Sequence, residues 1–305
     1  MKEVISSNGT AIAIRGLRKH FRGFDLGPLD LSVPKGSIYG FVGPNGAGKT
    51  VTIDLLFGMG RPDAGTIHIN GLDRAQNEVA IKKRAAYVGP ELDYGAWGQV
   101  GKALRFVRGF YPDTWDDEYC VKLLDLFGLR TQDRIASLSF GSRTKLSIVM
   151  ALARRPEILV LDEPTTGLDA IAKRELFTQL LDLVRDTDRT ILISSHSLSD
   201  VERFADRLGI INNGLMLHEG PTHEIVDRYC LVDFSLPAAT ALPPLEGMTL
   251  IRREGGRYRV LADRQSSAIP ELNSRGISNL TESPVTLEDL FVSLLKPGTP
   301  RPHAS

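Results

Sequence analysis

Four short apolar runs mark the strands that this chain is expected to form, and a small or polar residue follows each of them. The runs are Ile38–Val42, Ile158–Leu161, Thr190–Ser194 and Leu208–Ile211. Apolar runs of this length without alternation are typical of strands buried on both faces, as in a parallel sheet covered by helices. The pattern therefore predicts an α/β domain.

Apolar residues at helical spacing separate these runs. The sets Leu146, Val149, Met150, Ala153 and Cys120, Leu123, Leu124, Phe127 both fall at positions i, i+3, i+4 and i+7. Residues 92 to about 150 contain no strand-like run, so we expect a helical subdomain inserted between strands. Nearer the start, Ala11–Leu17 and Leu26–Val33 alternate as strands do, which predicts an antiparallel β subdomain beside the parallel core.

The last part of the chain is organised differently. Leu236–Gly247 holds three prolines and little periodicity, as is typical of a linker. The elements predicted after it are strands at Met248–Arg252 and Tyr258–Leu261, a short helix near Ile269–Arg275, and a final helix capped by Thr286 with Asp289. We therefore expect a domain over residues 1–230, a small α+β accessory domain over 231–295, and a disordered tail over 296–305.

Composition narrows the possible classes of function. The 305 residues carry 37 basic and 37 acidic side chains, and a net charge of zero argues against nucleic acid as the main partner. No apolar run approaches the ~18 to 20 residues that span a bilayer, and the first ten residues lack the core of a signal peptide. The chain is therefore expected in the cytosol. Two cysteines, Cys120 and Cys230, are too few for a disulfide framework or a multi-cysteine zinc site.

A glycine-rich segment joins the first apolar run to a helical stretch, Val51–Phe57. It fits the phosphate-loop pattern G-x-x-x-x-G-K-[ST] and consists of Gly43, Pro44, Asn45, Gly46, Ala47, Gly48, Lys49 and Thr50. In this motif the glycines let backbone N–H groups converge on a phosphate, so Lys49 is expected to reach the β- and γ-phosphates and the Thr50 hydroxyl can ligate Mg²⁺. Such a segment can also be a simple turn, but its place between strand and helix favours nucleotide binding.

Two adjacent carboxylates, Asp162 and Glu163, follow the second apolar run. In open α/β sheets, ligands bind beyond the carboxyl ends of the strands, which is where this pair lies. Asp162 is predicted to hold Mg²⁺ through water, and Glu163 is predicted to polarise the water that attacks the γ-phosphate. Acids that end a strand often only meet solvent, so this prediction depends on the phosphate loop.

Further motifs then occur in a fixed order. Leu138–Ser142 precedes a helical stretch, Asp162 lies 23 residues after Ser139, and His196 follows the third apolar run. This order resembles the ATP-binding subunits of ABC transporters over about residues 11–230. Segments 110–116 and 284–291 look like the ABC-2 exporter branch, in which the ATPase is a separate chain. The resemblance implies a P-loop NTPase of ABC type with the antiparallel and helical subdomains described above.

The resemblance also implies roles for individual residues. Two such domains close head to tail, so Ser139 and Gly141 of one chain would contact the γ-phosphate of ATP held by the other. His196 would contact the γ-phosphate, and Asp169 would link the two sites, although a helix N-cap also explains Asp169. Phe21 lies where the family places an aromatic ring on adenine. Phe24 is a rival, and core packing explains Phe21 equally well.

The sequence departs from the family pattern in three motifs. Val51 stands where the family usually has a second hydroxyl that contacts the α-phosphate. The absence of this hydrogen bond is expected to weaken nucleotide binding by ~0.5 to 1.5 kcal/mol. Pro90 occupies the place of a glutamine that senses Mg²⁺, and Glu91 is the nearest group for coordination through water. Phe140 and Ser142 replace Gly and Gln in the signature, while the phosphate-contacting Ser139 and Gly141 remain.

Three functions stay open from the sequence. The first is an ATP-hydrolysing subunit, with ATP and Mg²⁺, that energises a membrane exporter together with separate transmembrane permease subunits and a second ATP-binding subunit. It would sit on the cytoplasmic face of the membrane. The alternatives are an ABC-type ATPase that acts without a permease, and a regulatory nucleotide-binding subunit with weak hydrolysis.

Overall fold

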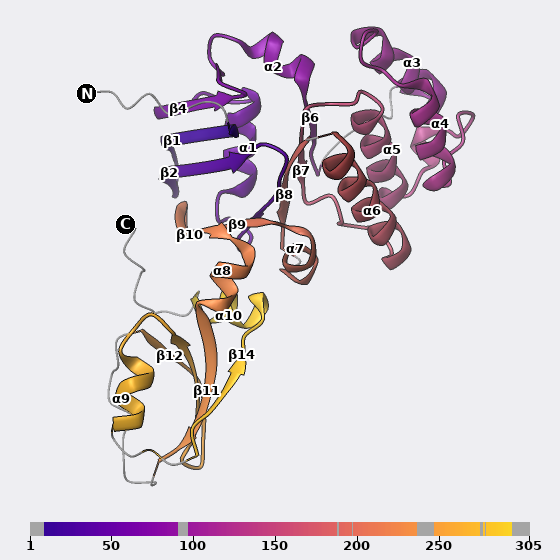
Figure 1. The fold of residues 1–305 in the computed structure, drawn as a ribbon. Helices are drawn as coiled ribbons and strands as arrows, with labels where there is room; N and C mark the ends of the chain where they lie inside the picture. Colours follow the sequence, from indigo (N-terminus) through magenta and orange to yellow (C-terminus); the bar gives the residue numbers. More distant parts are fainter. Residues whose placement is uncertain are drawn as a thin grey trace. The chain divides into compact units, whose positions relative to one another are not determined.

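A computed structural model describes residues 9–90, 97–187, 189–196, 198–236, 247–274, 277 and 279–294. The chain forms two compact units, one of residues 1–196 with 204–216 and the other of residues 197–203 with 217–305 (Figure 1). Glu91, most of the predicted linker and the predicted tail lie outside the described residues.

The first unit is built on a parallel sheet. Its strands are β3 (Ile38–Val42), β6 (Ala85–Val88), β7 (Ile158–Asp162), β8 (Thr190–Ser195) and β9 (Arg207–Asn212). Strand β10 (Leu215–Pro221) pairs with β9, and its residues from 217 onward belong to the second unit. The spatial order is β10-β9-β3-β8-β7-β6, and the pairs from β9 to β6 are parallel. Every residue of β3, β7 and β8 is buried, because both faces of the sheet are covered. All four apolar runs thus form the predicted strands.

A second, antiparallel sheet is formed near the chain start, as expected. It has the order β2-β1-β4-β5. Its strands are β1 (Thr10–Phe21), β2 (Phe24–Pro34), β4 (Ala64–Ile69) and β5 (Leu72–Asp73). Burial alternates along β2, so one face of this sheet contributes to the core while the other is more exposed.

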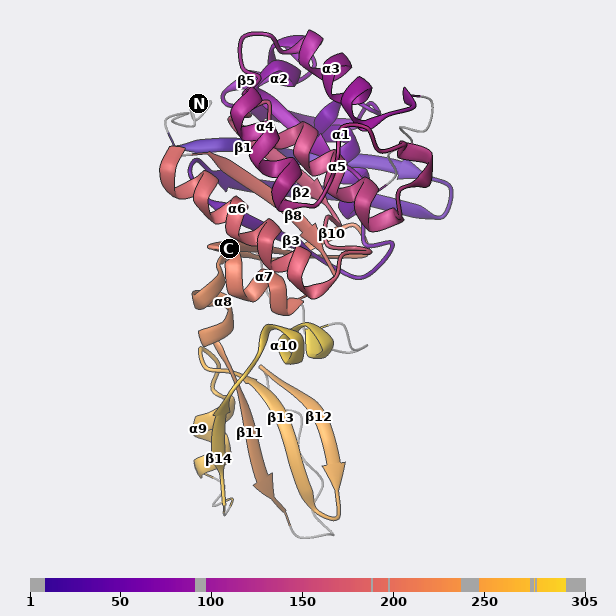
Figure 2. The same ribbon diagram turned by 90° about the vertical axis from the view of Figure 1, so that its right-hand side faces the viewer.

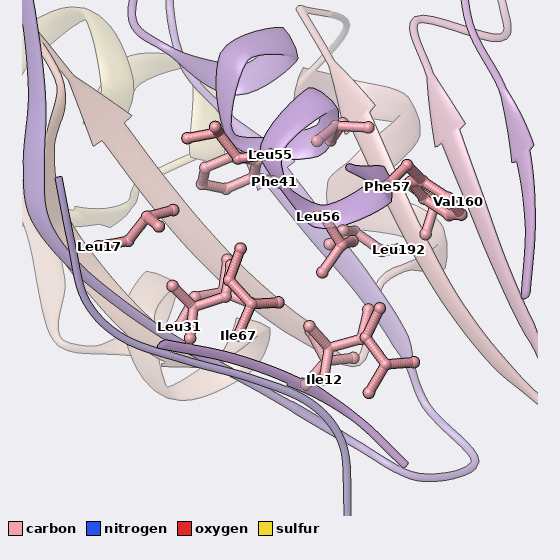
Figure 3. Close-up of a cluster of buried hydrophobic side chains, with 14 of the residues drawn as sticks. Ile12, Leu17, Leu31, Phe41, Leu55, Leu56, Phe57, Ile67, Val160 and Leu192 are labelled. Atoms are coloured by element: carbon pink, nitrogen blue, oxygen red, sulfur yellow. The ribbon is translucent and has the colours of Figure 1, made fainter. Parts of the chain in front are cut away.

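Helix α1 (Lys49–Phe57) joins the two sheets in one core. Leu55, Leu56 and Phe57 at its C-terminal end are buried among side chains from both sheets (Figure 3). Ile12 and Ile67 come from the antiparallel sheet, whereas Phe41, Val160 and Leu192 come from the parallel one. Burying large apolar side chains on this scale contributes ~1.5 to 3 kcal/mol per residue, so the helix that starts in the phosphate loop is firmly anchored.

The predicted helical segment lies between β6 and β7. Its described helices are α3 (Val100–Phe110), α4 (Asp117–Leu126), a 3₁₀ turn (Ile135–Ser137) and α5 (Phe140–Leu152). Helix α2 (Glu78–Arg84) precedes β6, and α6 (Ala170–Thr187) follows β7. The two predicted apolar stripes are buried on α4 and α5. Asp116 caps α4 by accepting the N–H of Tyr119 at 2.8 Å.

The second unit contains a four-stranded antiparallel sheet of order β12-β13-β11-β14 (Figure 2). Its elements are β11 (Tyr229–Ser235), β12 (Met248–Glu254), β13 (Arg257–Asp263), α9 (Ala268–Ser274), β14 (Thr281–Pro284), α10 (Leu287–Leu294), α8 (Thr222–Asp227) and most of α7 (Leu198–Phe204). Val232, Val260 and Leu272 belong to its own buried core. The predicted cap is present, because Asp289 N–H donates to Thr286 Oγ1 at 3.1 Å.

Candidate functional site

The phosphate loop leaves β3 at Gly43 and enters α1 at Lys49. A Cβ atom on Gly43 would lie 2.4 Å from the carbonyl oxygen of Ile211, so only glycine fits the backbone there. Gly48 has a φ of +109°, in the region that favours glycine, and it caps α1. The sequence therefore builds the tight strand-to-helix turn that presents a helix N-terminus to an anion.

Lys49 is the buried cation of this loop, with only 6% of the side chain exposed. Its Nζ donates to the carbonyl oxygens of Gly43 at 2.7 Å and Pro44 at 3.3 Å, and it lies 3.5 Å from Oε1 of Glu163. A buried ammonium needs anionic or strongly polar partners. The geometry fits the predicted role of Lys49, because a phosphate group would supply such a partner.

Asp162 ends β7 with 1% of its side chain exposed. Its Oδ1 accepts the hydroxyl of Ser194, whereas its Oδ2 is buried with no hydrogen-bond partner among the residues the structure describes. An orphaned carboxylate oxygen at this depth is costly unless a cation or water satisfies it. Asp162 therefore fits the predicted contact to Mg²⁺.

The electrostatic surroundings of Asp162 also favour a cation. Burial, and then the charge of Asp162, raise the pKa of Asp54 on α1 above its ordinary value. Burial and the same two carboxylates raise the pKa of the Tyr87 hydroxyl. Burial is the main cause of both pKa shifts, and the smaller contribution of the carboxylates is a negative charge that a divalent cation would neutralise.

A magnesium site here would depend on donors from the nucleotide. The described part of the chain contains no group of three or more His, Cys, Asp or Glu side chains suited to a metal. Mg²⁺ usually takes one or two protein oxygens and completes its shell with phosphate oxygens and water. Thr50, which is exposed at the start of α1, and Asp162 supply oxygen donors of that kind.

Glu163 lies between two other predicted site residues. Its Oε2 is 2.6 Å from Nδ1 of His196, and its Oε1 faces Nζ of Lys49. The backbone of Glu163 has a φ of +52°, and its N–H donates to the carbonyl oxygen of Ser194 at 3.2 Å. The side chain of Glu163 is 16% exposed and that of His196 is 61% exposed. The structure thus brings Lys49, Asp162, Glu163 and His196 together at one edge of the parallel sheet.

The predicted signature lies at the N-terminus of α5. Ser139 caps this helix by accepting the N–H of Ser142 at 3.1 Å. A Cβ atom on Gly141 would lie 2.4 Å from the carbonyl oxygen of Gly167, so the signature packs closely against the segment before Asp169. Ser139 and Gly141 therefore lie at a helix end suited to an anion.

Asp169 caps the N-terminus of α6, which is the alternative role that the sequence suggested for this residue. Its Oδ1 accepts the N–H of Ala172 at 2.9 Å. That hydrogen bond, with a smaller contribution from Lys145, holds the pKa of the carboxyl below its usual range. A role in linking two sites remains a prediction.

Phe21 ends β1 with 41% of the side chain exposed, and its ring centroid is 6.4 Å from that of Phe24. A Cβ atom on Gly48 would lie 3.0 Å from the Phe24 ring, so Phe24 packs on the phosphate loop. Phe21 is thus the more exposed of the two rings, with Nζ of Lys19 5.9 Å from its centroid, and its contact with adenine remains a prediction. Val51 is half-buried and packs on the core around α1.

Ser194 belongs to this site but was not predicted from the sequence. Ser194, fully buried in β8, contacts both Asp162 and Glu163. The available signal was a hydroxyl residue at the polar end of an otherwise apolar strand.

Together the sheet, the phosphate loop and the acidic pair define a P-loop nucleotide-binding ATPase. A family model described as "ABC transporter" matches residues 26–166. The bacitracin transport ATP-binding protein BcrA of Bacillus licheniformis is 32% identical over 89% of this chain and 92% of its own length. The daunorubicin/doxorubicin resistance ATP-binding protein DrrA of Streptomyces peucetius is 34% identical over 70% of this chain and 66% of its own length.

A solved structure of an ATP-binding subunit of an ABC transporter has a TM-score of 0.64 and 28% identity. It covers 72% of this chain and 92% of the other. The chain therefore belongs to the ATP-binding proteins of ABC transporters, a family of ATPases, and it binds ATP.

Proposed function

We propose that this chain hydrolyses ATP with Mg²⁺ to energise a membrane exporter made with separate permease subunits. One observation carries the proposal. The buried ammonium of Lys49, the unpartnered Oδ2 of Asp162 and the carboxylate of Glu163 converge where a nucleotide's phosphates would lie. The exporter class is supported by relatives that are named for bacitracin transport and Nod factor export.

Nucleotide binding would exchange the partners of Lys49. Its Nζ now donates to two loop carbonyls and faces Glu163, and phosphate oxygens would take the place of these weaker partners. Glu163 would then be released to polarise a water molecule, while its Oε2 stays within reach of His196. Bound Mg²⁺ would neutralise charge on the phosphates. Thr50 and Asp162 are the residues proposed to hold it.

The proposal includes a second ATP-binding subunit. Ser139 and Gly141 would contact the γ-phosphate bound to the partner, and Asp169 would link the two sites. The position of Ser139 supports this part of the proposal, because Ser139 is the N-cap of α5 and a helix N-terminus is suited to bind an anion. ATP would then hold the two subunits together, and hydrolysis would release them.

No helix in the described part of the chain is long and apolar enough to cross a membrane. We propose that the protein works at the cytoplasmic face of the membrane, with residues 1–230 as the ATP-binding domain. Residues 92 to about 150 would contact the permease. Residues 231–295 would form an accessory domain. The separate core of β11, β13 and α9 supports a second domain, although that core includes Cys230 and the compact second unit already begins at residue 217.

The experiment compares phosphate release and assembly for wild type, Glu163→Gln and the exposed control Glu157→Gln. We expect wild type and the control to hydrolyse ATP, and Glu163→Gln to lose at least about 100-fold in kcat and to accumulate as an ATP-bound dimer in light scattering. Purification from membranes of cells that express the neighbouring genes should recover a permease.

Two results would redirect the proposal. A wild type that binds ATP without releasing phosphate, alone or with a permease, would indicate a regulatory subunit. The altered signature residues Phe140 and Ser142 make that result worth testing. Hydrolysis without recovery of any membrane subunit would indicate an ATPase that acts without a permease.

A further inference from the structure

The hydroxyl of Ser194 connects the two acidic residues of the site. Ser194 lies in β8, between β3 and β7, and is opposite Asp162 in the parallel register. Its exposed fraction is 0%, and the same position in a buried strand is usually apolar. A fully buried hydroxyl is destabilising unless it forms hydrogen bonds, so the partners of Ser194 decide why it is tolerated here.

The direction of those hydrogen bonds is fixed by chemistry. An amide N–H can only donate, so the N–H of Glu163 donates to Ser194 Oγ at 3.1 Å. An ionised carboxylate can only accept, so the hydroxyl hydrogen goes to Oδ1 of Asp162. A single chain of donors thus runs from the Glu163 backbone through Ser194 to the Asp162 side chain.

Two consequences follow for the site. Because Oδ1 of Asp162 is occupied, Oδ2 is the oxygen left without a partner among the described residues. The same hydroxyl also helps to hold the backbone of Glu163 at a φ of +52°, a conformation that costs free energy in a residue with a Cβ atom. Ser194 therefore sets the orientation of one acid and the backbone of the other.

We propose that Ser194 is a positioning residue that prepares Asp162 for Mg²⁺ and Glu163 for polarising water. The inference rests on the proposed function, because it concerns the same site. Loss of the hydroxyl would leave Oδ1 of Asp162 without its partner. It would also leave the Glu163 N–H with only its 3.2 Å hydrogen bond to the carbonyl oxygen of Ser194, so both groups would reorient. The contact of Lys49 with phosphate would be retained, because Ser194 makes no part of the phosphate loop.

The test separates binding of ATP from its dependence on Mg²⁺. The full-length variants are Ser194→Ala, Ser194→Thr, Ser194→Cys and the control Ser147→Ala. Ser147 is also a buried serine, but it donates to the backbone carbonyl of Arg143 within α5. Each variant is titrated with a fluorescent ATP analogue in EDTA and again across Mg²⁺ concentrations, and kcat and KM are measured where hydrolysis occurs.

We expect Ser194→Ala to bind the analogue in EDTA within about two-fold of wild type, since the phosphate loop is intact. Its half-saturating Mg²⁺ concentration should rise about ten-fold, and kcat should fall about ten-fold with a smaller change in KM. Ser194→Thr keeps the hydroxyl, so its half-saturating Mg²⁺ concentration and its kcat should both be close to those of wild type. Ser194→Cys has a weak donor and should behave like Ser194→Ala, which preserves the test if alanine unfolds the chain.

Equal losses in Ser194→Thr and Ser194→Ala would overturn the proposal, because they would point to packing alone. A Mg²⁺ dependence of Ser194→Ala that matches Ser147→Ala would overturn it as well. If wild type binds Mg²⁺ and the analogue but releases no phosphate, the proposed hydrolysis fails while the Mg²⁺ titration still decides the role of Ser194.

Discussion

Nζ of Lys49 lies 3.5 Å from Oε1 of Glu163, so the residue that would hold the phosphates pairs with the residue proposed to polarise water. Both side chains are mostly buried, and this pair must separate when nucleotide enters. Glu163→Gln removes the competing charge and its repulsion of phosphate. We expect ATP to bind the variant about five-fold more tightly, or roughly 1 kcal/mol, in a fluorescence titration.

The matched control for this prediction is Glu157→Gln. Glu157 is 54% exposed, and its carboxylate contacts Arg84 and Asn70, away from the phosphate loop. The affinity of the Glu157→Gln variant for ATP should equal that of wild type. Equal or weaker binding by Glu163→Gln would show that the pair with Lys49 does not oppose nucleotide entry.

Gly141 is expected to tolerate no side chain. A Cβ atom there would lie 2.4 Å from the carbonyl oxygen of Gly167, so Gly141→Ala must displace the signature or the segment before Asp169. We expect a loss of ~1 to 3 kcal/mol in the free energy of unfolding and a fall in phosphate release.

Gly109→Ala provides the control for that change. Gly109 lies in α3 with no atom within 4 Å of its Cβ position, and alanine should stabilise the helix by ~0.5 to 1 kcal/mol. Urea denaturation measures the free energy of unfolding of both variants, and an ATPase assay measures their phosphate release. If Gly141→Ala were as stable and active as Gly109→Ala, the close approach to Gly167 would not constrain the signature.

Phe21 is predicted to stack on adenine. Its ring is exposed at the end of β1, whereas Phe24 packs on Gly48 of the phosphate loop. Phe21→Ala should weaken ATP binding by ~1 to 3 kcal/mol, and Phe21→Tyr should preserve it. Binding of triphosphate without a base should be the same in all three proteins. A uniform loss with both ligands would instead indicate that Phe21 only supports the fold.

His218 in the second unit makes stability depend on pH. Burial first, and then the guanidinium of Arg228, lower the pKa of His218 to about 4, although Asp263 opposes the shift. The Tyr229 hydroxyl lies 3.2 Å from its Nε2, which suits a neutral imidazole that accepts. As the pH falls from about 6.5 to about 4, the unfolded chain binds a proton that the folded unit does not.

Stability of the second unit should therefore be full above pH 6.5 and should decrease by about 2 to 3 kcal/mol by pH 4.5. Hydrogen exchange in β11 and β13, followed by mass spectrometry at the two pH values, measures this change. His218→Gln should lose that part of the pH dependence, whereas His223→Gln, at an exposed position, should keep it. An identical pH dependence in both variants would exclude His218 as its source.

Much of the site could be predicted from the sequence because its chemistry is local. The phosphate loop needs glycines at fixed spacing, and Asp162 and Glu163 follow directly on a buried strand, so neighbours in the chain define each motif. The apolar runs at Ile38–Val42 and Thr190–Ser194 likewise predict buried strands, since both faces of the sheet exclude water.

Contacts between motifs could not be predicted in the same way. The position of Ser194 against Asp162 depends on the register of β7 with β8, and 31 residues separate Glu163 from Ser194 in the chain. The sequence also left Phe24 as a rival of Phe21, and only the structure showed that Phe24 packs on Gly48.

The sequence alone therefore determined which segments are buried strands, and it predicted which residues carry phosphate and acid chemistry. Periodicity and glycine spacing are properties of consecutive residues, and this is why they can be interpreted without coordinates. Only the tertiary structure decided the contacts of Glu163 with Lys49 and His196, and those of Ser194 with both acidic residues. The physical reason is that parallel strands are joined by long crossovers, so their register is set by packing across the whole domain.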